Sequence, residues 1–204
     1  MAICYIIGAG DVSETDIIAK KEDFIICADA GYRYGDMLGR EPDLVVGDFD
    51  SLGRIPETEK RIVLPCEKDD SDMAVCVEEG LKRGYREFVL FGALGGERID
   101  HSIGNIQLLK YIASKGARGT IYHGNNVLTA FSDGELTFPE ESKGYISVFS
   151  LSEESNGVTI KNLKYTTDNV SLYSHRVRGL SNEFIGRRAS VSVREGILLT
   201  VYTK

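Results

Sequence analysis

Short apolar runs recur along the first 120 residues, and each is closed by Gly, Asp or Pro. Apolar runs of this length between turn residues are typical of buried strands. The pattern predicts five strands, at Ile3–Ile7, Phe24–Ala28, Leu44–Val46, Arg61–Leu64 and Glu87–Phe91.

Segments with apolar residues three and four positions apart lie between these strands, as expected for helices that pack on a sheet. The clearest runs from Asp72 to Arg83 and stops at Gly84. Further helices are expected over Ala30–Leu38 and about residues 101–115, with a short one around Glu14–Lys20.

Strands and helices thus alternate, which predicts an α/β fold. We expect a Rossmann-like parallel sheet with helices on its faces, forming an N-terminal domain over residues 1–120. Ligands of such sheets bind at the carboxyl ends of the strands. Five acids follow predicted strands and are expected at that edge: Asp29, Asp48, Asp50, Asp72 and Asp100.

The pattern changes after about residue 120, where helical spacing gives way to short alternating runs. Turn signals separate several runs, at Asp133-Gly134, Asn156-Gly157 and Glu195-Gly196. We expect a C-terminal all-β sandwich domain over residues 125–204. A domain this small is expected to pack on the first domain or on a partner chain. The runs are Val127–Phe131, Glu135–Phe138, Tyr145–Phe149, Val158–Ile160, Val170–Tyr173, Ala189–Val193 and Ile197–Tyr202.

Composition narrows the class of protein. The 204 residues carry a formal net charge of −7, which does not attract polyanions, so we expect no nucleic-acid partner. No apolar run approaches the roughly 20 residues of a membrane span, so no membrane association is expected. The first residues read as a strand rather than a signal peptide, and the expected location is cytoplasmic. The four cysteines form no CxxC or metal-like spacing with His, and buried reduced thiols are expected.

Two acids lie on either side of Phe49, at the end of a predicted buried strand. Carboxylates this close repel by roughly 4 kcal/mol at 4 Å for an effective dielectric constant near 20. A bound divalent metal is the simplest cation to offset that repulsion. A solvated Asp-rich turn is the alternative for Asp48 and Asp50, and Asp29 and Asp72 could instead serve helix N-termini.

Several acids at one sheet edge, glycine turns and no obvious nucleophile favour metal-assisted phosphoryl chemistry, in which Mg²⁺ bridges phosphate oxygens. The chain has no GxxxxGK[ST] loop and no kinase HRD or DFG motif. Ser13 replaces the third Gly of a GxGxxG loop, which weakens a dinucleotide-binding interpretation. His101 lies at the head of a predicted helix, where a structural role is favoured over general base catalysis.

Five motifs give the chain a resemblance to bacterial thiamine pyrophosphokinases over nearly its whole length. They occur in family-like order and spacing across both predicted domains, which makes the match specific. The motifs are Ala28-Asp29-Ala30-Gly31, Pro42-Asp43-Leu44-Val45-Val46-Gly47-Asp48-Phe49-Asp50-Ser51, Lys68-Asp69-Asp70-Ser71-Asp72, Gly95-Gly96-Glu97-Arg98-Ile99-Asp100-His101 with Gly104-Asn105, and Gly179-Leu180-Ser181-Asn182-Glu183-Phe184.

The resemblance implies an ATP-dependent enzyme that converts thiamine into thiamine diphosphate and releases AMP. The hydroxyl of thiamine would attack the β-phosphorus, with Mg²⁺ as cofactor. It also implies a homodimer with thiamine near the subunit interface. By match to the motifs, Mg²⁺ and the phosphates would be held by Asp48, Asp50, Asp72 and Asp100.

The same match implies further ligand contacts. The nucleotide side would include Asp29, Gly31, Lys68, Arg98 and Asn105, although Lys68 and Arg98 could instead pair with neighbouring acids. Ser181 and Asn182 would meet thiamine, contributed by the partner subunit. Tyr165 falls where family members carry an aromatic residue against the thiamine ring, in some relatives Trp, and a core position is its alternative. A Tyr face would favour the cationic thiazolium by about 1 kcal/mol.

Three points stay open from the sequence. The proton of the thiamine hydroxyl would pass to a carboxylate, with Asp100 or Asp72 as the hypothesis. Asp48-Phe49-Asp50 could be the DxD motif of a haloacid-dehalogenase-type phosphatase, although Leu52 stands where that motif has Thr or Val. A thiamine- or nucleotide-binding sensor without turnover is the non-enzymatic alternative.

Overall fold

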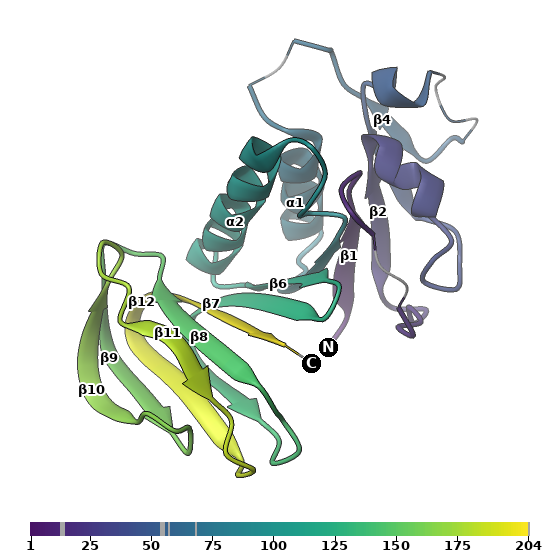
Figure 1. Cartoon of the computed structure of the whole chain (residues 1–204). Helices are drawn as coiled ribbons and strands as arrows, with labels where there is room; N and C mark the ends of the chain where they lie inside the picture. The colour runs from purple at the N-terminus through teal and green to yellow at the C-terminus, as the bar shows by residue number, and fades with distance from the viewer. Residues whose placement is uncertain (13–14, 54–55, 57, 68, 204) are drawn as a thin grey trace. The chain divides into compact units, whose positions relative to one another are not determined.

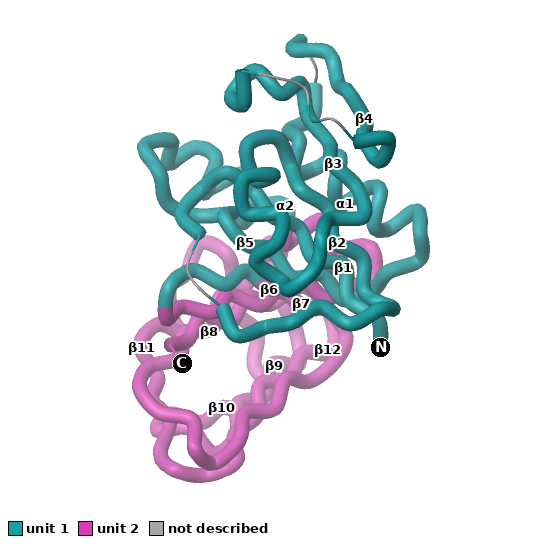
Figure 2. The backbone as a smooth tube through the Cα atoms, turned by 90° about the vertical axis from the view of Figure 1, so that its right-hand side faces the viewer, with its two compact units in different colours: residues 1–108, 121–124 teal, residues 109–120, 125–204 magenta. Residues whose placement is uncertain are grey.

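The computed structural model describes residues 1–204 except 13–14, 54–55, 57, 68 and 204. Two compact units make up the chain (Figure 2). Unit 1 comprises residues 1–108 and 121–124, and unit 2 comprises residues 109–120 and 125–204.

Unit 1 contains a parallel sheet of five strands (Figure 1). The order is β5-β1-β2-β3-β4, and every pair in it is parallel. All five predicted strands are therefore present, with bounds β1 (Ile3–Ile7), β2 (Phe24–Ala28), β3 (Leu44–Gly47), β4 (Arg61–Val63) and β5 (Glu87–Phe91).

Two α-helices follow strands of this sheet. Helix α1 (Asp72–Lys82) lies within unit 1, packs on β1, β2 and β3, and buries the apolar face that its sequence predicts. Helix α2 (Ile99–Ser114) passes from unit 1 into unit 2 after Leu108. Both predicted helices are confirmed, with ends within two residues of the expected ones.

The helix expected over Ala30–Leu38 is wrong. The structure has a 3-10 helix, η1 (Asp29–Tyr34), followed by turns that end at Gly39. A Cβ on Gly31 would lie only 2.1 Å from the Ile7 carbonyl oxygen, so this segment is packed directly against β1. Tertiary packing thus overrides a short segment whose glycines give it little helix propensity.

The short helix around Glu14–Lys20 is also wrong for its described part, since residues 15–20 are not helical. Backbone N–H groups of this segment make tertiary hydrogen bonds instead. Ala19 donates to the Leu38 carbonyl at 2.9 Å, and Lys20 donates to Oδ2 of the buried Asp23 at 2.8 Å. These bonds replace the i to i−4 bonds that a helix would need.

Strands β1, β2, β3 and β5 are largely buried, as expected in a parallel sheet, whereas the edge strand β4 is mostly exposed. Tyr5, Phe91 and Tyr122 stack on one face, with ring centroids 6.4 and 5.7 Å apart. Cys4, Cys27 and Cys76 are buried free thiols, as predicted, whereas Cys66 is exposed. Burial raises the pKa of the Cys27 thiol to about 12, so this group is an inert core residue.

Unit 2 is antiparallel apart from the helical segment that opens it. Strand β12 (Ala189–Thr203) is its centre, because it pairs with β7 (Asn126–Phe138) along most of its length, with β9 (Glu154–Lys161) near its start and with β8 (Tyr145–Ser150) near its end. Strand β6 (Arg118–His123) spans the boundary between the units. The other strands are β7 (Asn126–Phe138), β8 (Tyr145–Ser150), β9 (Glu154–Lys161), β10 (Thr167–Tyr173), β11 (Gly179–Glu183) and β12 (Ala189–Thr203).

The turns predicted for this unit are wrong, because the chain does not reverse direction at any of the three positions. Asp133-Gly134 lies inside β7, Asn156-Gly157 inside β9 and Glu195-Gly196 inside β12. The register of β7 against β12 shifts between Val193 and Ile197, which marks an irregularity of the bulge type. Gly and Asp in left-handed backbone conformations make such bulges as readily as they make hairpin turns.

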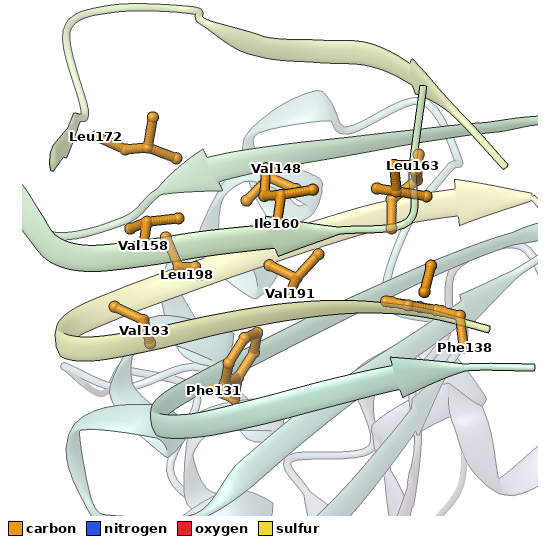
Figure 3. Close-up of a cluster of buried hydrophobic side chains, with 12 residues drawn as sticks. Phe131, Phe138, Val148, Val158, Ile160, Leu163, Leu172, Val191, Val193 and Leu198 are labelled. Atoms are coloured by element: carbon orange, nitrogen blue, oxygen red, sulfur yellow. The ribbon is translucent and has the colours of Figure 1, made fainter. Parts of the chain in front are cut away.

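The core of unit 2 lies between side chains of β7, β8, β9, β10 and β12 (Figure 3). Phe131, Val148, Ile160 and Val191 point toward one another in this cluster, and each is buried. Phe138 packs edge-on against Tyr202, with ring centroids 5.2 Å apart. No helix in the described part of the chain is long and apolar enough to span a membrane.

Candidate functional site

Three of the predicted edge acids meet at the carboxyl ends of β2 and β3. Ala28 lies opposite Val46 in the parallel ladder, so Asp29 and Asp48 leave the sheet from neighbouring strands. Asp29, Asp48 and Asp50 each offer a carboxylate oxygen, and these oxygens lie within 4.8 Å of one another. At that separation and a dielectric constant near 20, each pair of ionised carboxylates repels by about 3.5 kcal/mol.

The donor set of this group suits a divalent cation. All three side chains offer oxygen, the ligand atom that Mg²⁺ prefers. Oδ1 of Asp29 is buried and accepts no hydrogen bond from any described residue. A buried carboxylate oxygen of this kind is normally satisfied by a donor or an ion. The residues present therefore fit a bound Mg²⁺.

Backbone geometry at the group is unusual. Asp29 has φ 44° and Phe49 has φ 62°, both in the left-handed region that residues with a Cβ rarely adopt. Such conformations cost roughly 1–2 kcal/mol per residue and gather at functional sites. Asp29 is the first residue of η1 and Ala28 occupies the N-cap position, so N-capping does not explain this acid.

Two glycines support the group by their packing. Gly31 is buried against the end of β1, where a Cβ would meet the Ile7 carbonyl. Gly47 lies against Asp29, and a Cβ there would be 3.0 Å from the Asp29 Cα. These positions thus carry glycine because neighbouring backbone approaches closely.

Asp72 begins α1, where it is half-buried. The N-cap of that helix is Ser71, whose Oγ accepts a hydrogen bond from the Ala74 N–H at 3.2 Å. Ser71 therefore performs the capping that could otherwise have explained the acids before this helix. Asp72 and Asp100 do not belong to the group formed by Asp29, Asp48 and Asp50. Lys68 lies outside the described residues.

Asp100 forms an exposed ion pair with Arg98. Arg98 Nε donates to Oδ1 at 2.9 Å, and Nη2 donates to Oδ2 at 2.5 Å. Hydrogen bonding by Arg98 lowers the pKa of the Asp100 carboxyl to about 2. Of the two roles that the sequence left open for Arg98, the structure shows the pairing with a neighbouring acid.

Asn105 is buried in α2, and its Nδ2 donates to the Ala93 carbonyl at 2.6 Å. Ser102 of the same helix accepts a hydrogen bond from the Gly95 N–H at 3.2 Å. Both side chains tie the helix to the loop after β5. The Asn105 side chain therefore makes its observed hydrogen bond to the backbone of the loop that follows β5.

The three residues expected to meet thiamine lie together in unit 2. Asn182 is buried, and its amide accepts from the Tyr165 N–H at 2.9 Å and donates to the Tyr165 carbonyl at 2.7 Å. Tyr165 is 62% exposed, so the core position left open for it is excluded. Ser181 is exposed, has φ 57°, and its N–H donates to the Ser147 Oγ.

One acid at the sheet edge was missed. Asp11 follows β1, its N–H donates to the Leu94 carbonyl at 3.0 Å, and its carboxylate lies where a Cβ on Gly95 would be. The available signal was the one used for the other acids, namely an Asp shortly after an apolar strand. The sequence pattern around Gly8 and Gly10 was interpreted only as an incomplete GxGxxG loop, which does not point to Asp11.

A cluster of acids at the carboxyl ends of parallel strands, in a chain that continues into an all-β unit, indicates an enzyme that transfers phosphate groups. The catalytic-domain model of thiamin pyrophosphokinase matches residues 15–121, and its vitamin B1 binding domain model matches residues 135–198. The chain belongs to the thiamine pyrophosphokinase family.

Individual relatives agree with this assignment. Thiamine pyrophosphokinase of Bacillus subtilis is 32% identical over 165 residues, which cover 76% of this chain and 75% of the relative. A crystal structure of the Bacillus subtilis enzyme superposes with a TM-score of 0.80 at 26% identity, covering 100% of this chain and 99% of the other. The Geobacillus thermodenitrificans enzyme gives a TM-score of 0.79 at 28% identity, with 99% and 97% covered.

Proposed function

We propose that the chain transfers the diphosphoryl group of ATP to the hydroxyl of thiamine, giving thiamine diphosphate and AMP. The observation that carries this proposal is the meeting of Asp29, Asp48 and Asp50 in a chain of the thiamine pyrophosphokinase family. We infer that unit 1 is a Rossmann-like nucleotide domain, with a boundary near residue 120. Unit 2 is then a sandwich-type thiamine domain from about residue 125.

Mg²⁺ bound at the three carboxylates would neutralise charge on the triphosphate and make its β-phosphorus easier to attack. Asp29 would supply a buried oxygen to this cation, and Asp48 and Asp50 would supply oxygens from just after β3. This extends the ligand set expected from the family motifs, in which Asp29 was assigned to the nucleotide. Asp72 and Asp100 complete the acidic edge without belonging to this group.

The proton of the attacking hydroxyl needs an acceptor. Arg98 lowers the pKa of Asp100 to about 2, and a carboxylate so acidic accepts a proton poorly at neutral pH. We therefore assign the proton acceptor to Asp72, which is half-buried at the start of α1. Asp100 and Arg98 then act as a pair, whose guanidinium would contact the phosphates of ATP.

Thiamine would meet the exposed ring of Tyr165, whose face attracts the thiazolium cation. Lys164 lies 5.7 Å from that ring, but its ammonium is held by Glu183 at 2.8 Å, which leaves it partly neutralised. Asn182 fixes the backbone of Tyr165 through two hydrogen bonds, so it supports this contact from behind. We infer a homodimer in which thiamine lies near the subunit interface.

The test is AMP release from ATP and Mg²⁺, with and without thiamine. The proposal expects thiamine-dependent AMP that EDTA abolishes. Asp48→Asn is expected to lose at least about 100-fold of the rate, because a ligand of the cation loses its charge. Asp36→Asn is the matched control, since Asp36 is an exposed acid of unit 1 outside the group.

The other products separate the alternatives. ADP would indicate transfer of one phosphoryl group, and inorganic phosphate would indicate a phosphatase. Binding of thiamine and ATP without any AMP would indicate a sensor. Each of these three results contradicts the proposed diphosphoryl transfer.

The dimer has its own test. Asp48→Asn and Tyr165→Ala chains are each expected to be less active alone, and to regain activity when they are unfolded and refolded together. In a mixed dimer one site then combines an intact unit 1 with an intact unit 2 from the other chain. No recovery, with mixed dimers formed, would place both residues in a site within one chain.

A further inference from the structure

Phe49 has a conformation that its side chain disfavours. It lies between two acids of the carboxylate group, with φ 62° and ψ 18°. A bulky residue is rare in this left-handed region, where Gly and Asn are the usual choices. Some other feature of Phe49 must therefore hold the backbone in place.

The ring of Phe49 supplies that feature. Only 1% of the residue is exposed, and it belongs to a core cluster with Cys27, Leu38 and Val45. Leu52, three residues later, packs against the same cluster. The strongly buried ring thus anchors the turn between Asp48 and Asp50 to this core cluster.

The backbone after Phe49 turns at once. The Leu52 N–H donates to the Phe49 carbonyl at 3.2 Å, which closes the short 3-10 helix η2 (Asp50–Leu52). The Asp50 N–H donates to Oδ1 of Asp48 at 3.3 Å, so the two acids are also linked to each other. Both acids are therefore held by the turn that Phe49 centres.

We propose that Phe49 is a positioning residue, whose buried ring holds the left-handed turn that presents Asp48 and Asp50, together with Asp29, to one divalent cation. This rests on the proposed function, because that function makes the three acids a metal site. Glycine would fit the backbone at this position but would lose the anchor. Phe49 keeps the anchor, and the core packing around its ring maintains the disfavoured backbone.

The experiment measures Mn²⁺ binding to the full chain by electron paramagnetic resonance, without nucleotide or thiamine. Mn²⁺ is the probe because it takes the same oxygen ligands as Mg²⁺. Phe49→Leu keeps an apolar side chain that is not branched at Cβ. Phe49→Val keeps apolar bulk, but its branched Cβ disfavours the left-handed conformation. Phe49→Gly accepts that conformation but has no anchor.

The expected result is a split among these variants. Phe49→Leu should bind Mn²⁺ within about threefold of the unaltered protein, whereas Phe49→Val and Phe49→Gly should bind about 10-fold or more weakly, the usual range for residues that orient metal ligands. Equal affinity of all folded variants would overturn the proposal. If Phe49→Gly does not fold, as judged by circular dichroism, the Mn²⁺ affinity of Phe49→Val compared with Phe49→Leu tests the proposal.

Leu38→Ala is the matched control, because Leu38 is fully buried in the same cluster but is not next to an acid of the group. It should lower thermal stability and leave Mn²⁺ affinity unchanged. If it weakens Mn²⁺ binding as much as Phe49→Val, the effect is general loss of packing and the positioning role is wrong.

Failure of the proposed function is seen separately. No thiamine-dependent AMP from the unaltered protein contradicts the proposed reaction, while the Mn²⁺ comparison still tests the role of Phe49. Normal AMP release with no difference among the Phe49 variants contradicts the positioning role alone.

Discussion

At the carboxyl edge of the sheet in unit 1, close contacts between backbone atoms affect the conformation of single residues as much as charge does. Asp29 adopts a left-handed conformation and lies against Gly47. Phe49, which follows Gly47 by two residues, also adopts a left-handed conformation. The sequence predicts an acidic edge, since acids follow apolar strands. It does not show that these two residues have positive φ, because side chains with a Cβ normally avoid that region.

Gly47→Ala tests the contact with Asp29. The new Cβ would lie 3.0, 3.1 and 3.2 Å from the Asp29 Cα, Cβ and N, so Asp29 must shift by a few tenths of an ångström. We expect thiamine-dependent AMP release to fall by about 10-fold, since small misplacements at a reacting site are costly. The measurement is the rate at saturating ATP and thiamine, together with Mn²⁺ affinity.

Gly134→Ala is the control for this change, because the nearest atom to its Cβ would be the Ser132 carbonyl oxygen at 3.6 Å. It should leave the rate unchanged. Unchanged rate and Mn²⁺ affinity in Gly47→Ala would show that the position of Asp29 is not critical.

The ion pair of Arg98 with Asp100 gives a pH prediction. The folded-state pKa of Asp100 is about 2, below its ordinary value near 3.9, so the pair favours the fold above about pH 4. That contribution is lost as the pH falls from about 4 through 2. It is small, because both side chains are exposed.

Arg98→Ala should raise the pKa of Asp100 toward its ordinary value, as followed by carbon NMR of the labelled carboxyl. Arg33→Ala is the control, since Arg33 bonds to the Ser51 carbonyl and not to Asp100. An Asp100 pKa that stays near 2 without Arg98 would assign the shift to another cause.

Two elements of unit 2 show where local sequence signals mislead. Val127–Phe131 and Glu135–Phe138 were expected as two strands but form one, β7, and Ala189–Val193 and Ile197–Tyr202 join in β12. Both joins have left-handed backbone, as Asp133 has φ 44° and Gly196 has φ 96°. Whether such a residue reverses the chain or only bulges it depends on the strands alongside.

Gly196→Ala tests the bulge of β12. The residue has φ 96°, and a Cβ would lie 2.7 Å from the Ser155 Oγ and 2.9 Å from the Glu154 carbonyl oxygen. We expect a loss of more than about 1 kcal/mol in the free energy of unfolding. Urea denaturation measures it.

Gly134→Ala again serves as the control, because Gly134 lies opposite Val193 at the same irregularity but has space for a methyl group. It should change stability by less than about 0.5 kcal/mol. If Gly196→Ala has the same free energy of unfolding as the unaltered protein, the bulge accommodates a Cβ and the prediction is wrong.

Tertiary contacts also decide which of the predicted helices form. Helices α1 and α2 have 11 and 16 residues and each buries some of its apolar residues, and the sequence predicted both. The described segments at 15–20 and 30–38 are short, and the Ala19 N–H joins them by its hydrogen bond to the Leu38 carbonyl, while the Lys20 N–H donates to the Asp23 carboxylate. Short helical patterns are weak in isolation, so tertiary contacts decide their structure.

The two units differ in the chemistry that they carry. Unit 1 holds the carboxylate group and matches the catalytic-domain model, and unit 2 matches the vitamin B1 binding model. A divalent cation should therefore act on the stability of the chain through unit 1.

Mg²⁺ at about 100 times its Kd is expected to raise the free energy of unfolding by about 2.7 kcal/mol, because it binds only the folded site. Calorimetry with and without Mg²⁺ measures the shift of the melting temperature as several degrees. Asp48→Asn should abolish the shift, and Asp36→Asn should keep it. An equal shift of the melting temperature in Asp48→Asn would show that the cation binds outside the carboxylate group.

The sequence by itself determined the alternation of strands and helices, the change to an all-β unit, and the acids that follow the strands, because these features depend on local periodicity and turn residues. Only the tertiary structure decided which acids meet. Pairing of β2 with β3 joins Asp29 to Asp48 and Asp50, whereas Asp72 and Asp100 stay outside the group. Strand register and left-handed backbone come from packing between distant residues, which no local pattern records.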